Sequence, residues 1–147
     1  MRMFQIFCFL AAMIGYGAAD AQCQALQPGT TTITFQSPTY SDFRQLLARE
    51  APTGTVTIQG NLSFPEEKKD RYPVVIVVHG ITGYRDANEG YAANELRKAG
   101  FATLTYDSFA ARGTTGAAMS GTPAYLPAGV VDAYAARQVL ASDPRID

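Results

Sequence analysis

The feature that most constrains this chain is the stretch from Pro73 to Tyr84, which reads PVVIVVHGITGY. A continuous run of apolar β-forming residues is typical of a parallel strand buried on both faces. The run leads directly into His79, Gly80 and Gly83, so a glycine-rich loop follows the strand. Such a loop has two chemical uses: to cradle the phosphates of a dinucleotide, or to offer backbone N–H groups to a carbonyl oxygen that becomes negative.

The surrounding pattern predicts an α/β fold that is entered from an antiparallel edge. We expect strands at 30–35, closed by Ser37-Pro38, and at 53–64, where apolar residues alternate up to a break at Gly60-Asn61. That second segment is a strand or a kinked hairpin. A short helix lies between them, with Ser41 and Asp42 as capping candidates.

Parallel strands alternating with helices are expected from residue 73 onward. The prediction is a strand at 73–78, a helix at 88–99 stopped by Gly100, a strand at 101–106, a long loop up to Pro123 and a helix at about 127–141. Ile146 is expected to begin one more strand, beside 73–78. The residues expected to share the buried helix faces are Tyr91, Ala92, Leu96 and Ala99, and then Val131, Tyr134, Ala135 and Val139.

The length of the chain is that of one domain, and its charge does not favour nucleic acid as a partner. The chain has 147 residues and a formal net charge of −1, so it has no basic excess that would attract nucleic acid. Partners therefore have to be argued from a site.

The first 21 residues have the layout of a cleaved secretory signal, with Arg2 near the start, an apolar stretch, and Ala19-Asp20-Ala21 before Gln22. The alternative is an anchoring helix, but Gly15, Gly17 and Asp20 interrupt the apolar run. We therefore expect a mature domain at 22–147 that is exported to the periplasm or the extracellular space and has no membrane span. Cys23 would be its one cysteine, which excludes an intrachain disulfide.

The dinucleotide interpretation depends on Gly80-x-x-Gly83 and on Asp107, which ends the next strand where a ribose-binding carboxylate belongs. Asp86 stands at the third glycine position, where its carboxylate would lie close to a pyrophosphate. The predicted helix also begins too late for its N–H groups to point at the phosphates. These two departures favour the carbonyl interpretation.

The stretches PVVIVVHGITG, LRKAGFATLTYDSFAARG and DAYAARQVL before DPRID resemble the N-terminal half of a dienelactone hydrolase-like protein of the α/β-hydrolase superfamily. The resemblance runs from about Thr32 to Asp147. It implies that the Ile81 N–H binds the oxyanion, that Gly80 allows the close approach, and that the substrate is a small ester or lactone cleaved by acyl transfer to water. It implies no cofactor and no metal.

The resemblance also implies a nucleophile elbow, Gly-x-Ser-x-Gly or Gly-x-Cys-x-Gly, that this sequence lacks. Ser120 lies in AMSGT and has no such frame. We therefore expect residues 22–147 to be the N-terminal portion of a hydrolase domain that ends before its nucleophile and is inactive alone. The alternatives are a non-catalytic exported binding domain and, with less support, a dinucleotide-binding domain.

Three further residues are candidates for the site. His79 is the only histidine, and the family pattern places the catalytic base later in the chain, so we expect His79 to brace the loop by hydrogen bonding. Asp107 has the same expected role. For Arg112, contact with an acidic group of the substrate and fixation of its own loop both stay open.

Overall fold

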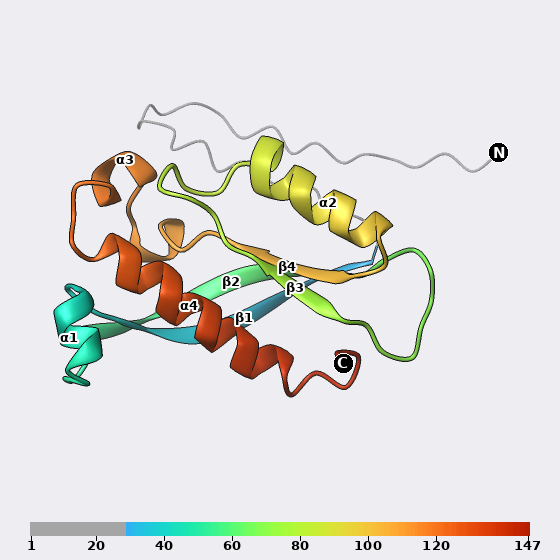
Figure 1. Ribbon diagram of the computed structural model, residues 1–147, viewed down its shortest axis with the longest axis horizontal. Coiled ribbons are helices and arrows are strands. Elements are labelled where there is room, and N and C mark those ends of the chain that lie inside the picture. Colours follow the sequence, from blue (N-terminus) through green and yellow to red (C-terminus); the bar gives the residue numbers. More distant parts are fainter. Residues whose placement is uncertain (1–28) are drawn as a thin grey trace, which may run out of the picture.

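A computed structural model describes residues 29–147, and the expected signal segment, its junction at Gln22 and Cys23 lie outside that range. The described chain forms a mixed α/β fold around one sheet (Figure 1). The strands are β1 (Thr30–Thr39), β2 (Gly54–Ser63), β3 (Val74–Val77) and β4 (Ala102–Tyr106), in the spatial order β1-β2-β4-β3. The pairs β1–β2 and β2–β4 are antiparallel and β3–β4 is parallel, so most of the sheet is antiparallel.

The helical segments of the described chain are α1 (Phe43–Leu47), the π-helical turn η1 (Asp86–Gly90), α2 (Tyr91–Lys98), the 3₁₀ turn η2 (Ala110–Arg112), α3 (Gly116–Met119) and α4 (Tyr125–Leu140). Asp42 caps α1 as predicted, since its carboxylate accepts the Gln45 N–H at 2.8 Å. Gly100 ends α2 as predicted, with a φ of 94° that favours glycine. Helix α2 packs against β4 and β3, while α4 packs mainly against β1.

Strand β4 is the centre of the fold, because it lies between β2 and β3 and all of its residues are buried. Leu104 is fully buried, together with Ile58 and Leu62 of β2. The Phe35 ring packs edge-on against the Tyr106 ring, with centroids 5.4 Å apart. These side chains join the C-terminal half of α4 in one apolar core.

The two N-terminal strands differ from the prediction in length. Strand β1 continues through Ser37 and Pro38 instead of stopping there. Proline lacks the N–H that a ladder needs, but an edge strand bonds on one side only and tolerates it. The break expected at Gly60-Asn61 is absent from β2, which runs through both residues as one strand.

Strand β3 is parallel to β4 as expected, but the prediction that it is buried on both faces is wrong. All of its residues are half-buried, and Val78, which follows it, is 39% exposed. The reason is position, because β3 is an edge strand of the described sheet. Ile146 adds a single parallel bridge to Tyr72, just before β3, rather than a strand.

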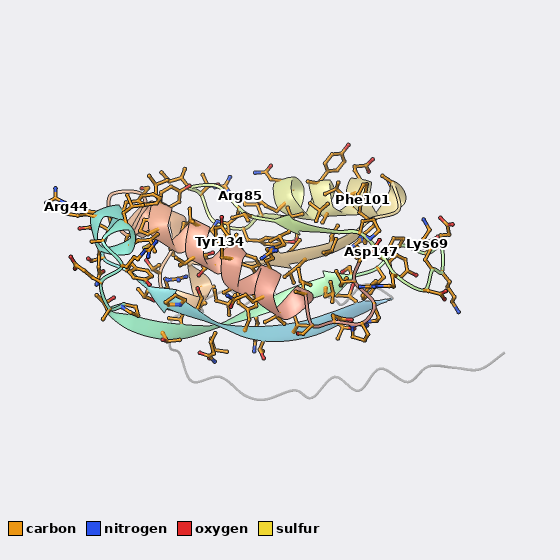
Figure 2. The ribbon with its side chains drawn as sticks, turned by 60° about the horizontal axis from the view of Figure 1, so that its bottom comes forward. Arg44, Lys69, Arg85, Phe101, Tyr134 and Asp147 are labelled. Atoms are coloured by element: carbon orange, nitrogen blue, oxygen red, sulfur yellow. The ribbon has the colours of Figure 1, made fainter. Side chains whose placement is uncertain are left out.

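The predicted face of α2 is wrong, because Tyr91, Ala92 and Ala99 are exposed and the buried residue is Ala93, and the predicted face of α4 is wrong at Tyr134. Tyr91 is 63% exposed on α2, and Tyr134, labelled on α4 in Figure 2, is 66% exposed. The buried stripe of α4 instead follows an i, i+4 spacing through Ala128, Asp132, Ala136 and Leu140. Val131 of the predicted face is also buried, and Ala135 and Val139 pack against the core, so apolar periodicity located the buried side of α4 in part and missed the charged residue within it.

Candidate functional site

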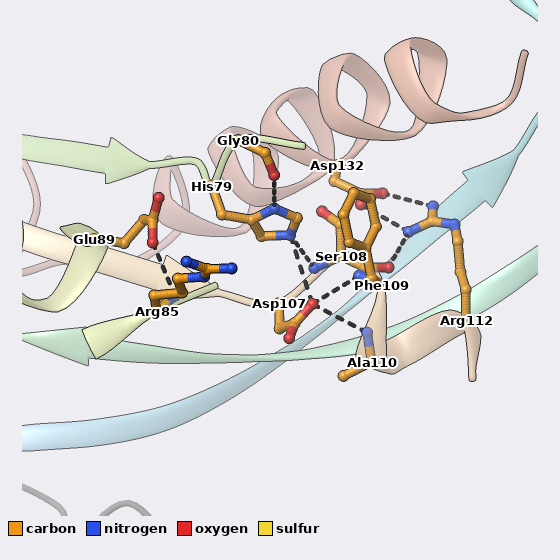
Figure 3. A network of polar contacts seen from close by, with 10 residues as sticks. All are labelled: His79, Gly80, Arg85, Glu89, Asp107, Ser108, Phe109, Ala110, Arg112 and Asp132. Atoms are coloured by element: carbon orange, nitrogen blue, oxygen red, sulfur yellow. Dashed lines mark hydrogen bonds and ion pairs between the residues drawn. The ribbon is translucent and has the colours of Figure 1, made fainter. Parts of the chain in front are cut away.

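The glycine-rich loop after β3 and the turn after β4 lie side by side (Figure 3). This follows from the parallel pairing of β3 and β4, because parallel strands end at the same edge of a sheet. The sequence segments 79–83 and 107–112 are therefore brought together, as both interpretations of the loop require.

The loop is a tight turn that closes on the Gly80 carbonyl. The Gly83 N–H donates to the Gly80 oxygen at 3.1 Å, and Gly83 has a φ of 81°. A Cβ built on Gly80 meets nothing within 4 Å, so the space beside Gly80 is open. A Cβ on Gly116, at the start of α3, would lie 2.4 Å from the Thr82 carbonyl carbon, so α3 packs directly on the loop backbone.

His79 is buried behind this loop, with 2% of its side chain exposed. The Ser108 N–H donates to its Nε2 at 3.0 Å, and its Nδ1 lies 2.8 Å from the Gly80 oxygen. A backbone N–H can only donate, so Nε2 carries a lone pair, and Nδ1 carries the proton that it donates to Gly80. Both ring nitrogens are therefore engaged. The Phe109 ring packs edge-on against the imidazole, with centroids 4.5 Å apart.

Asp107 caps the turn that follows β4. Its Oδ1 accepts the Phe109 N–H at 2.8 Å and the Ala110 N–H at 3.0 Å. The same oxygen lies 3.5 Å from the Nε2 of His79. His79 and Asp107 thus meet, but the Ser108 N–H occupies the Nε2 lone pair, which is the position that a base would use to take a proton.

Arg112 points into the protein and pairs with Asp132, whose exposure is 0%. Its Nη1 and Nη2 donate to the two Asp132 oxygens at 2.8 Å each, and Nη1 also donates to the Ser108 oxygen at 2.8 Å. The hydroxyl of Ser37, on β1, donates to Asp132 as well. The Arg112 guanidinium therefore has partners within the chain and only 8% of the side chain exposed.

Asp132 and Ser108 are two residues of this cluster that the sequence analysis did not single out. Asp132 carried a signal, since it is a carboxylate within the apolar run Val130-Val131-Asp132-Ala133 of a helix. Ser108 carried none beyond its place after Asp107. Nearby, burial raises the pKa of the Tyr106 hydroxyl, and the negative charge of Asp132 raises it further.

Ile81 lies on the outer side of the loop and is 44% exposed. Its N–H makes no hydrogen bond to another described residue. The Gly80 carbonyl and the Ile81 N–H belong to one peptide, and the described chain has no cis peptide bond. In a planar trans peptide the C=O and the N–H point in opposite directions. Because His79 and Gly83 hold the carbonyl on the inner side, the Ile81 N–H points outward.

An apolar depression of about 430 Å³ adjoins His79 and Ser108. Its other wall is the exposed face of α4, and the lining residues beside His79 and Ser108 are Val78, Phe109, Tyr125, Leu126, Gly129, Val130, Ala133 and Tyr134. A larger depression of about 710 Å³ lies around Lys69 and Arg97, but none of the loop residues lines it. The smaller one is the relevant one, because it is next to the engaged histidine.

Within residues 29–147, no three His, Cys, Asp or Glu side chains gather closely enough to hold a metal ion. In the same range no helix has the length and apolar character needed to cross a bilayer. No protein-family model matches the chain, and no curated protein matches it closely enough to count as a relative.

Proposed function

We propose that this chain forms the carbonyl-binding part of an exported α/β-hydrolase of the dienelactone hydrolase type, which cleaves a small ester or lactone. The observation that carries the proposal is the peptide between Gly80 and Ile81. Its carbonyl is held from behind by His79 and Gly83, and its N–H is directed outward. A fixed N–H donor beside open space is what stabilisation of an oxyanion requires.

The depression beside the loop supports a small apolar substrate. Its walls are aliphatic and aromatic side chains, with His79 and Ser108 as the polar members. An acyl chain or ring in this depression would lie next to the loop that carries the Ile81 N–H. Binding pockets for small molecules commonly combine apolar walls with a few polar groups.

One observation supports the alternative that the chain is a non-catalytic binding domain. The only histidine has both ring nitrogens engaged, so the described residues include no free imidazole to act as a base. The hydrolase proposal therefore assigns carbonyl binding to these residues and places attack on the carbonyl elsewhere. It predicts that this chain alone does not hydrolyse simple esters above a buffer control.

The dinucleotide alternative has less support. One carboxylate oxygen of Asp107 already accepts the N–H groups of Phe109 and Ala110, and α2 begins only after the turn η1. The N–H groups at the start of α2 are thus separated from Gly80 and Gly83 by a further segment.

The test is a titration of the ¹⁵N-labelled protein with methyl phenylphosphonate, a tetrahedral monoanion that resembles the intermediate of ester hydrolysis. We expect a saturable shift of the Ile81 amide signal at millimolar concentration. Gly80→Ala should keep its stability, because its Cβ meets nothing within 4 Å, and should lose binding, because the methyl group blocks the approach. Gly121→Ala is the matched control, since its Cβ also meets nothing within that distance.

Two results would contradict the proposal. One is an Ile81 signal that does not respond to the phosphonate, and the other is unchanged binding in Gly80→Ala. Export is tested separately: protein recovered from a secreting host should begin at Gln22, and retention of Met1 would refute the signal assignment.

A further inference from the structure

We infer that the buried pair Arg112–Asp132 is a positioning device for the loop at Gly80 and Ile81. Arg112 holds Ser108, Ser108 holds His79, and His79 holds the Gly80 carbonyl (Figure 3). The consequence for ligand binding rests on the proposed function. The hydrogen-bond relay itself does not, and it is measurable without a ligand.

The relay starts from a fixed point. Asp132 is completely buried on α4, receives two N–H groups from Arg112 and is also bound by Ser37 of β1. A buried carboxylate without its partner is strongly unfavourable, so the guanidinium is held in place. Three segments that are distant in sequence, β1, η2 and α4, therefore meet at one carboxylate.

Ser108 is the second link and is held from both sides. Arg112 donates to its carbonyl oxygen at 2.8 Å, and the next N–H in the chain, that of Phe109, is bound by Asp107 at 2.8 Å. Ser108 is 1% exposed, so water does not compete for these contacts. Both contacts fix the peptide between Ser108 and Phe109, and the N–H of Ser108 in the adjoining peptide donates to His79 at 3.0 Å, so a displacement of the Ser108 carbonyl is passed to that bond.

The third link is a choice between two tautomers of His79. With the Ser108 N–H in place, Nε2 accepts and Nδ1–H donates to the Gly80 oxygen. Without it, a proton on Nε2 would face Asp107 Oδ1, which lies 3.5 Å away. The bare Nδ1 would then face the Gly80 oxygen, lone pair to lone pair. That carbonyl would turn, and the Ile81 N–H in the same planar peptide would turn with it.

The tautomer is directly observable because His79 is the only histidine of the chain. We would record the ¹⁵N signals of its ring at about pH 8, because the two tautomers are forms of the neutral imidazole. The unaltered protein should show the Nδ1–H form. Arg112→Lys keeps a positive charge beside Asp132 but loses the fork that reaches Ser108. We expect it to raise the population of the Nε2–H form and to weaken phosphonate binding about tenfold, the value of one hydrogen bond.

Two controls separate positioning from loss of stability. Arg145→Lys alters an ion pair with Asp143, remote in sequence from the loop, and Ile58→Val removes one methyl group from the core. Both should leave the His79 tautomer unchanged, although Ile58→Val lowers stability by removing buried surface. If Arg112→Lys does not fold, Ser37→Ala is the variant to measure. It keeps the ion pair between Arg112 and Asp132 but removes one hydrogen bond to Asp132, so it should shift the tautomer of His79 in the same direction to a smaller extent.

The inference is overturned if a folded Arg112→Lys or, where that variant unfolds, Ser37→Ala retains the tautomer of the unaltered protein. It is also overturned if Ile58→Val shifts the tautomer equally. If the unaltered protein does not bind the phosphonate, the proposed function is wrong. The tautomer measurement needs no ligand, so it would still test the hydrogen-bond relay.

Discussion

Replacement of Gly116 by alanine should displace the candidate oxyanion loop. Gly116 is buried at the start of α3, and a Cβ there would lie 2.4 Å from the Thr82 carbonyl carbon and 2.6 Å from the Ile81 and Thr82 oxygens. Ordinary van der Waals contact begins at 3.4 Å, so the two segments have to separate by 3.4 − 2.4 Å, which is 1.0 Å. The obstacle is backbone on the loop side, which cannot rotate away as a flexible side chain can.

The expected cost follows from two opposing effects. Forcing an extra methyl group into a packed site destabilises a protein by about 1–3 kcal/mol. Alanine is a better helix former than glycine by at most about 1 kcal/mol, and less at a helix end. We therefore expect a net loss of about 1–2 kcal/mol in the free energy of unfolding.

The assays are urea unfolding and the amide chemical shifts of residues 80–83. The matched control is Gly129→Ala in α4, where a Cβ meets nothing within 4 Å, so that the change should stabilise the protein by about 0.5–1 kcal/mol. A Gly116→Ala variant with unchanged stability and unchanged Ile81 and Thr82 signals would refute the reasoning that α3 holds the loop.

Three other perturbations test the core and its charges. Gly60→Ala should lower the free energy of unfolding by about 1–3 kcal/mol, because a Cβ at this position would lie 2.8 Å from Leu104 Cδ1. The loss should be smaller in a Leu104→Ala background, and an additive double-mutant cycle would contradict this contact. Tyr106→Phe should change stability by less than about 1 kcal/mol at neutral pH, because the buried hydroxyl has no partner among the described residues. The pKa of Tyr106 is raised in the folded protein, so the unfolded chain ionises first and stability falls as the pH rises above about 10. Tyr106→Phe lacks this ionisation and should unfold at a higher pH. Equal alkaline midpoints would refute this. The hydrogen bonds from Arg145 lower the pKa of Asp143. The stability lost by Asp143→Asn should therefore be full at neutral pH and decrease as the pH falls below about 4, the ordinary value for a free carboxyl. A pH-independent difference in urea midpoint would contradict this.

Local sequence signals determined most of the secondary structure. Asp42 predicted the start of α1, and Gly100 predicted the end of α2. The alternating residues of 53–64 predicted an antiparallel strand, and the apolar run from Val74 predicted a parallel one. Each signal acts within a few residues of the chain, through a cap, a backbone conformation or a periodicity, and so it can be recognised without knowing the fold.

Long-range contacts decided what those signals could not. Pro38 stays in a strand because β1 lies at an edge, and β3 is half exposed for the same reason. Edge position is a property of the whole sheet, and although a proline is compatible with an edge strand, the apolar run of β3 does not distinguish an edge strand from a central one.

The candidate site shows the same division. The sequence placed His79, Gly80 and Ile81 in one loop after a strand, because they are consecutive. Only the tertiary structure brings Arg112 to Asp132, which is 20 positions further along the chain, and the Ser108 N–H to the ring of His79, which is 29 positions before it. Burial makes those polar contacts obligatory, because a charged or polar group without water needs a partner from the chain. Which residue supplies that partner is set by the packing of α4 against β1 and by the pairing of β3 with β4, and no spacing in the sequence encodes it.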